Sequence, residues 1–155
     1  MSNTHAPFAP SGLARVVACP GSYNLIRAAR AADLSLNEDD TDESREGTAA
    51  HAVAAHLIKY GELMQVGSLV CNGVAVTEEM VEGAQMYAEA VAPYLDGARI
   101  EEHIECMVVH RDCHGTPDFT HGPKDGVLFV ADYKFGHRYV SPEMNWQLIA
   151  YAIGS

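Results

Sequence analysis

The chain has 155 residues, of which 48% are hydrophobic and 20% are charged. This length and composition predict one soluble domain, spanning residues 1–155, with enough apolar surface to bury a core. The formal net charge is -11 at pH 7. Proteins that grip nucleic acids through the phosphates usually carry a basic face, so this charge argues against tight nonspecific DNA binding by the chain alone.

Neither a targeting signal nor a membrane span is predicted. Residues 1–22 lack a long apolar segment, and no stretch reaches the roughly 18 apolar residues that a spanning helix needs. We expect residues 1–10 to be flexible and the acidic run at 37–45 to form a solvated loop. A cytoplasmic protein with no membrane partner is the resulting expectation.

Three helices are predicted in the first hundred residues. The first follows Ser22. The second is capped by Ser44 and ends at Gly61, because serine favours the N-cap and glycine the left-handed C-terminal position. The third is capped by Thr77 and carries an apolar stripe at helical spacing as far as Leu95. These stripes predict packing against a common core.

A strand is predicted over residues 99–109, and it carries three acidic residues. Since side chains alternate between the two faces of a strand, Glu101 and Glu105 would share one face and Glu102 would point to the other. We take Glu105 as an additional candidate metal ligand.

The four cysteines contain no Cys-X-X-Cys pair, so reduced thiols are expected rather than a disulfide framework. The spacing of several cysteines and histidines could nevertheless suit a structural zinc ion, which prefers thiolate and imidazole ligands. An interaction module stabilised by zinc is therefore an alternative interpretation. Its ligands would come from Cys106, His110, Cys113, His114 and His121.

A buried strand is predicted over Val127–Ala131, an apolar run that follows turn residues. Just beyond it, Asp132 and Lys134 would project from one face and Tyr133 from the other. A hairpin with its turn near residues 124–126 would bring Asp118 opposite Asp132 to within about one residue.

Two carboxylates so close repel each other unless a cation lies between them, and carboxylate oxygens suit Mg²⁺ or Mn²⁺. Lys134 could then orient water and stabilise charge that develops on a phosphate. The segment alone also leaves open an ordinary salt bridge at a solvated strand end.

The last helix is predicted to begin at Ser141, which is followed by a proline and an acid. Gln147 and Tyr151 lie four residues apart on one face, so both could reach the same ligand. The alternative is that Tyr151 packs in the core and Gln147 lies on the surface. In the preceding loop, Arg138 would place positive charge beside a bound phosphate.

Several segments occur in the order of a known family's motifs. Pro117-Asp118 and then Asp132-Tyr133-Lys134 match a nuclease signature in its Asp-X-Lys form. Residues 46–51, Glu-Gly-Thr-Ala-Ala-His, are similar to a Gly-X-X-X-His helix, and residues 147–151 to a Gln-X-X-X-Tyr helix. The chain thus resembles the RecB-type branch of the PD-(D/E)XK nucleases over roughly residues 11–155. Residues 19–22 and 115–118 are similar to phage and prophage proteins of that superfamily.

The resemblance implies an α/β fold with a restriction-endonuclease-like core, in which helices flank a small mixed β-sheet. It implies a metal-dependent deoxyribonuclease, a phage recombination or replication exonuclease that hydrolyses phosphodiester bonds. The cofactor would be one or two Mg²⁺ or Mn²⁺ ions. The implied metal ligands are His51, Asp118, Asp132 and the backbone carbonyl of Tyr133. The implied catalytic residues are Asp118, Asp132 and Lys134, and Gln147, Tyr151 and Arg138 would bind substrate. Glu46 and Glu105 are additional candidates for the site.

The expected partners are DNA, a phage recombination or replication protein, and a second copy of the chain, in a bacterial cytoplasm.

Some RecB-type nucleases hold an iron-sulfur cluster through one upstream and three downstream cysteines. Cys19 matches the upstream position, but the others do not occur, so no cluster is expected. The family usually continues with a further strand, so a minimal or truncated form is expected. A noncatalytic binding or assembly module on the same fold remains an alternative, which the acidic composition favours.

Overall fold

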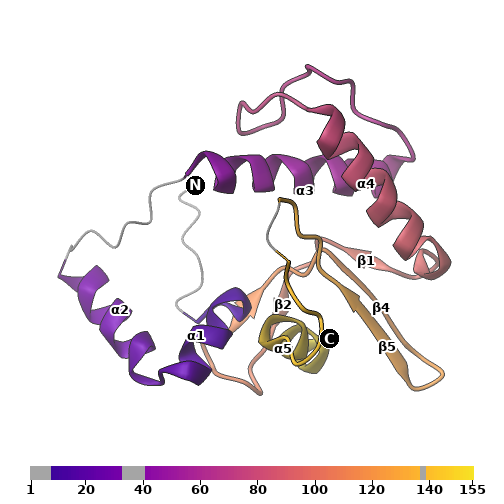
Figure 1. The fold of residues 1–155 in the computed structure, drawn as a ribbon. Coiled ribbons are helices and arrows are strands. Elements are labelled where there is room, and N and C mark those ends of the chain that lie inside the picture. Colours follow the sequence, from indigo (N-terminus) through magenta and orange to yellow (C-terminus); the bar gives the residue numbers. More distant parts are fainter. Residues whose placement is uncertain (1–7, 33–40, 137–138) are drawn as a thin grey trace. The chain divides into compact units, whose positions relative to one another are not determined.

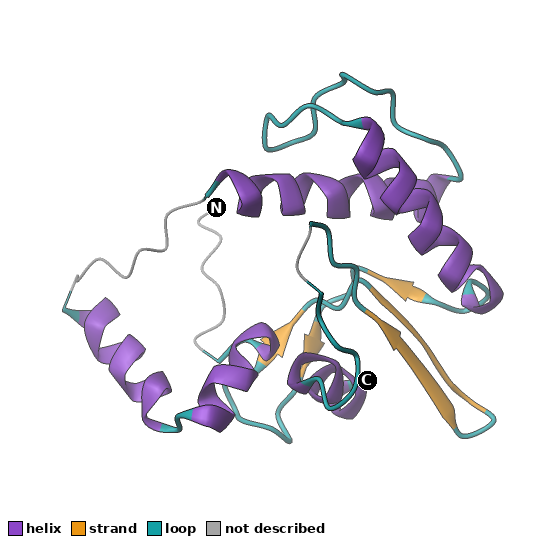
Figure 2. Cartoon of the chain, in the orientation of Figure 1, coloured by secondary structure: helices purple, strands orange, loops and turns teal. Residues whose placement is uncertain are grey.

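The computed structural model describes residues 8–32, 41–136 and 139–155. The chain forms two compact units, each assembled from separate stretches of sequence. Unit 1 comprises Met1–Asp39, His103–Pro117 and Ser141–Ser155, and unit 2 comprises Asp40–Glu102 and Asp118–Val140. Both contain helices and short antiparallel strands, so the expected mixed α/β content is confirmed (Figures 1 and 2).

Unit 1 is mainly helical. Its α5 helix begins after Asn145, whose side chain accepts hydrogen bonds from the amides of Gln147 and Leu148 at 3.0 and 3.3 Å. The predicted start at Ser141 was therefore wrong, because the cap lies four residues later. The elements of unit 1 are η1 (Pro10–Gly12), α1 (Leu13–Ala18), α2 (Gly21–Ala31), β2 (Ile104–Glu105), β3 (His114–Gly115) and α5 (Trp146–Gly154).

Unit 2 carries the two long helices and a three-stranded sheet. Thr41 caps α3 by accepting from the amide of Ser44 at 3.2 Å, so Ser44 is inside the helix rather than its cap. Gly61 ends α3 in the left-handed conformation, and Thr77 caps α4, both as predicted. The elements are α3 (Asp42–Tyr60), α4 (Glu78–Val91), η2 (Ala92–Tyr94), β1 (Arg99–Ile100), β4 (Phe119–Lys124) and β5 (Val127–Ala131).

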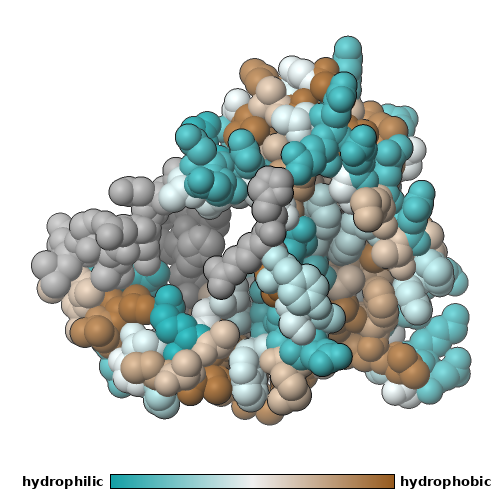
Figure 3. All heavy atoms as spheres, viewed as in Figure 1, coloured by the Kyte–Doolittle hydropathy of each residue, from teal (hydrophilic) through white to brown (hydrophobic). Residues whose placement is uncertain are grey.

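The core of unit 2 lies between α3 and α4. Small and β-branched residues of α3, among them Ala50 and Val53, pack on Met80 and Ala84 of α4 and are essentially inaccessible to solvent. Tyr133 and Phe135 pack against this cluster from the segment after β5. In the view of Figure 3, hydrophilic residues cover most of the surface over α3, as expected for the outer side of an amphipathic helix.

The sheet of unit 2 has the strand order β1-β4-β5, and both pairings are antiparallel. β5 has the predicted bounds, and the hairpin turns at Asp125 and Gly126, which both have positive φ. A mixed sheet was expected, but every strand pairing in the described residues is antiparallel. Beside the sheet, the rings of Tyr94 and Phe129 stack with centroids 4.0 Å apart.

The predicted strand over residues 99–109 does not form. The chain leaves β1 at Glu101, which has a φ of 56°, and β2 begins only at Ile104 in the sheet of unit 1. A left-handed residue turns the backbone out of the extended conformation and ends the alternation of side chains. The inference that Glu101 and Glu105 share one strand face was therefore wrong.

Candidate metal centre

Three acidic residues occupy one row across the sheet of unit 2. Ile100 pairs with Phe119, and Phe119 pairs with Ala131. Continuing both registers by one residue places Glu101, Asp118 and Asp132 side by side, just beyond the ends of the ladders. Paired residues project from the same face, so the hairpin brings Asp118 and Asp132 together as the sequence predicts.

Asp118 is the centre of the hydrogen-bond network in this row. Its Oδ1 lies 2.9 Å from Nδ1 of His51, a residue of α3. Its Oδ2 accepts a hydrogen bond from the backbone amide of Tyr133 at 2.6 Å. Both carboxylate oxygens are thereby oriented, and the side chain is only 13% exposed. Tyr133 takes part in this network through its backbone amide. That its backbone carbonyl binds a metal ion stays a prediction.

Glu101 completes a convergent group with His51 and Asp118. One potential ligand atom from each residue lies within 4.8 Å of those of the other two. Among the described residues, these three are the ones whose His, Cys, Asp or Glu side chains converge in this way. The backbone also links two of them, because the Glu101 amide donates to the Asp118 carbonyl at 3.2 Å. The left-handed conformation of Glu101 thus occurs at the candidate site itself.

The three side chains fit a divalent cation. Two ligand atoms at about 2.1 Å from one Mg²⁺ ion can be up to about 4.2 Å apart, which is close to the 4.8 Å within which the three ligand atoms lie. Two carboxylates and one imidazole are a donor set suited to Mn²⁺ or Mg²⁺ rather than to a soft metal. No Cys belongs to the group, which further favours a hard cation.

Asp132 and Lys134 form an ion pair beside this group. The Asp132 side chain is only 8% exposed, whereas that of Lys134 is 41% exposed. The ammonium group of Lys134 is thus the more accessible partner of the pair. Asp132 and Lys134 are thus in direct contact, and Asp118 is near enough for its charge to raise the pKa of Asp132.

Electrostatic coupling links the members of the site. Burial alone would lower the pKa of His51, but its hydrogen bond with Asp118 and the charges of Asp118 and Asp132 outweigh burial and raise it. Burial raises the pKa of Asp132, as does the charge of Asp118, and Lys134 partly offsets both. Burial and the Asp118 charge also raise the pKa of Glu101. Excess negative charge is thus concentrated where a cation would be stabilised.

Two tyrosines border the site. The Tyr133 ring lies 5.4 Å from that of His51 and 5.1 Å from that of Tyr87. Burial raises the pKa of both phenols. Gly83 of α4 provides the space for the Tyr133 hydroxyl, because a Cβ at that position would overlap it.

Glu101 is the residue that sequence reasoning ranked wrongly. Glu105 was preferred, but it belongs to β2, where its carboxylate lies 3.3 Å from Nε2 of His103. Glu46 is exposed near the start of α3 and projects about 140° around the helix axis from His51. The cross-strand row would have identified Glu101, since it is opposite Asp118 once the β1–β4 register is extended by one residue.

The predicted substrate-binding residues of α5 belong to unit 1. Tyr151 is 5% exposed and its hydroxyl donates to the Thr116 carbonyl at 3.4 Å, as the packing alternative expects. Gln147 is half-buried. Their contact with DNA stays a prediction, and Arg138 lies outside the described residues.

The alternative zinc site receives no support from the described residues. The cysteines and histidines of residues 106–121 do not form a convergent group there. Nδ1 of His110 instead accepts from the Asp112 amide at 3.1 Å, and its ring stacks on Phe8 with centroids 4.6 Å apart. Cys106 and Cys113 are buried free thiols.

The chain is similar to a known protein family. No helix of the described residues is long and apolar enough to cross a membrane. No solved structure matches the chain. Residues 5–155 match the model of a family described as "Protein of unknown function (DUF2800)". Since this match covers nearly the whole sequence, the chain belongs to the DUF2800 family.

Proposed function

We propose that unit 2 is a metal-dependent nuclease site of the PD-(D/E)XK type, which hydrolyses phosphodiester bonds of DNA. The observation that carries this proposal is the convergence of His51, Glu101 and Asp118 beside the Asp132–Lys134 pair. A metal-binding group next to a partly exposed ammonium is the arrangement that phosphodiester hydrolysis needs, because the reaction adds negative charge to a phosphate that is already anionic.

The side chains would divide the work. His51, Glu101, Asp118 and Asp132 would hold one or two divalent ions, which when bound supply charge for the phosphate oxygens and a water of lowered pKa. The Tyr133 amide fixes the orientation of the Asp118 carboxylate. Lys134, held by Asp132, would position the attacking water and stabilise the pentavalent phosphate as its charge increases.

The topology of unit 2 supports the same proposal. The β1-β4-β5 meander places the carboxylates at adjacent strand ends, and α3 supplies the histidine. The resemblance in sequence implies a restriction-endonuclease-like core, and we propose this fold for unit 2. A role in phage recombination or replication belongs to the same proposal.

A noncatalytic binding module is the second candidate, and the net charge of -11 favours it because naked DNA would be repelled. The experiment that separates the two is a screen of Mg²⁺, Mn²⁺, Ca²⁺ and EDTA with end-labelled linear DNA, both single- and double-stranded. We expect cleavage with Mg²⁺ or Mn²⁺ and none with EDTA. Absence of cleavage with every metal and both forms of DNA would favour the binding module.

A further inference from the structure

A cleft of about 440 Å³ opens beside the candidate metal centre. One wall is the α4 helix and the other is the segment that follows β5. Its volume is within the roughly 300–1,000 Å³ typical of small-molecule sites. Asp132 and Lys134, which belong to the proposed catalytic group, also line the cleft. The other lining residues are Glu79, Glu82, Gly83, Met86, Tyr87, Tyr133, Phe135 and Gly136.

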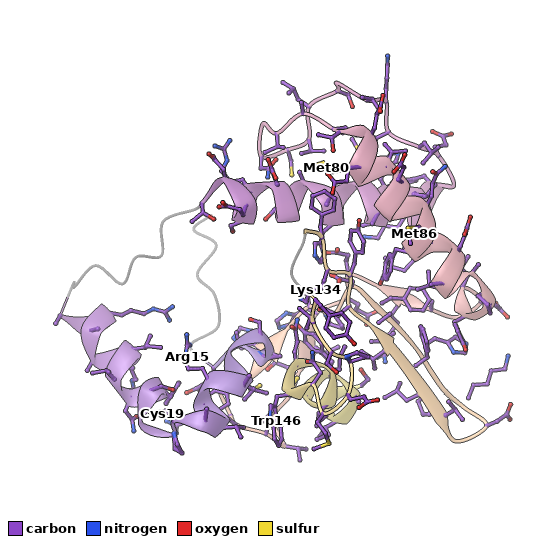
Figure 4. All side chains as sticks on the ribbon, in the orientation of Figure 1. Arg15, Cys19, Met80, Met86, Lys134 and Trp146 are labelled. Carbon is purple, nitrogen blue, oxygen red and sulfur yellow. The ribbon has the colours of Figure 1, made fainter. Side chains whose placement is uncertain are left out.

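The walls of the cleft favour a flat, neutral group. Met86 and Phe135 offer apolar and aromatic surface from opposite walls, and Met86 is 72% exposed. Figure 4 shows the side chains of Met86 and Lys134, which mark the two bordering segments. Thioether and aromatic groups interact well with the face of a π system.

Charge makes the α4 side of the cleft unsuitable for a phosphate. Glu79 and Glu82 line the α4 wall, and the cation of the lining, Lys134, is already paired with Asp132. An anion at this wall would be repelled by the two glutamates, whereas the amino and imino groups of a nucleobase could donate hydrogen bonds to them. The phenol oxygens of Tyr87 and Tyr133 are buried and have no hydrogen-bond partner in the described residues, so their rings rather than their hydroxyl groups border the cleft.

We propose that this cleft receives an unpaired nucleobase of the nucleotide next to the scissile phosphate. The inference rests on the proposed nuclease function, because Asp132 and Lys134 join the cleft to the metal centre. A base in a duplex is paired and stacked on both faces, so it can enter only after it has been extruded. The substrate class is therefore single-stranded DNA, or duplex ends that are frayed.

Two variants of α4 test the proposal. Met86 and Ala90 are both exposed on this helix, but only Met86 is among the residues that line the cleft. Met86→Glu and Ala90→Glu add the same charge to the same helix, so they are a matched pair. Met86→Glu should raise KM for a single-stranded oligonucleotide roughly tenfold, as expected when one base loses its stacking surface, with Mn²⁺ affinity unchanged. Ala90→Glu should have little effect.

The same oligonucleotide should be cleaved with a higher kcat/KM as a single strand than as a blunt duplex. Equal kcat/KM for both forms, or equal effects of the two glutamate variants, would overturn the inference and leave the nuclease proposal intact. If neither form is cleaved, the nuclease proposal fails, and the base site in the cleft is then tested by binding of the single strand alone. Fluorescence of 2-aminopurine in the single strand should then be quenched by the wild type and not by Met86→Glu; no quenching by the wild type would reject the base site as well.

Discussion

Nδ1 of His51 lies 2.9 Å from Oδ1 of Asp118, although 67 positions separate the two residues in the chain. This contact joins α3 to the start of β4 and sets the distance between the histidine and the row of carboxylates. A metal ligand must be deprotonated, so an ion bound by both side chains would take the place of this contact. The predictions below follow from this arrangement.

The His51 contribution to stability should depend on pH in the absence of metal. Its pKa is raised in the folded state, so the contribution is fully present below about 6.5, the value in the unfolded chain, and is lost as pH rises through the folded value. Urea unfolding in EDTA should therefore show a larger difference between wild type and His51→Gln at pH 6 than at pH 8.5. A difference that stays constant or grows with pH would contradict the assigned shift.

Glu101 and Glu105 should respond differently to loss of charge. Glu101 belongs to the convergent group, whereas Glu105 is near His103, so only Glu101→Gln should weaken Mn²⁺ binding. The loss should be at least the roughly 10- to 100-fold that even an outer-sphere partner of a metal site contributes. Calorimetric titration with Mn²⁺ measures it, and Glu105→Gln is the control. Equal affinities of the two variants would remove Glu101 from the ligand set.

Lys134 should matter for hydrolysis and not for metal affinity. Lys134→Ala removes a cation from beside Asp132 but no ligand, so Mn²⁺ binding should persist or tighten while cleavage falls by roughly a hundredfold or more. Lys124→Ala is a matched control, because Lys124 is exposed at the other end of β4. Cleavage by Lys134→Ala at the wild-type rate would show that this lysine is only a salt-bridge partner.

The four thiols should fall into two classes. Cys19 and Cys71 are exposed, whereas Cys106 and Cys113 are buried, and burial raises the pKa of Cys113 to about 12. Since the thiolate is the reactive form, two thiols should react quickly with Ellman's reagent at pH 8 and two only after unfolding. Rapid reaction of all four in the native protein would contradict the burial of the pair.

The sequence predicted the structure best at positions where the backbone conformation or the burial allows only one type of residue. The apolar run of β5, the glycine after α3 and the turn at Asp125 and Gly126 each satisfy a specific backbone or burial requirement, so their positions could be predicted. The hairpin register followed, and with it the proximity of Asp118 and Asp132. Helix starts were harder, because more than one residue near the start of α3 and of α5 is a good N-cap, and residue type alone does not select Thr41 and Asn145.

Glu101 was ranked below Glu105 for a physical reason. Alternation along a strand treats the two as equivalent, and a glutamate with positive φ is too rare to be expected from sequence. The turn at Glu101 also divides the predicted strand between two sheets, which separates residues that are adjacent in the chain. Such a break depends on long-range pairing and is therefore not encoded in the local pattern.

The most direct test of the proposed function compares wild type with Asp118→Asn, which keeps the shape of the side chain but removes its charge. Both proteins are incubated with end-labelled single-stranded DNA in Mn²⁺, and cleavage is followed on a sequencing gel. We predict cleavage by the wild type that EDTA abolishes, and a loss of roughly a hundredfold or more for Asp118→Asn. Equal cleavage by the two proteins, or no cleavage by the wild type, would contradict a nuclease site built on Asp118.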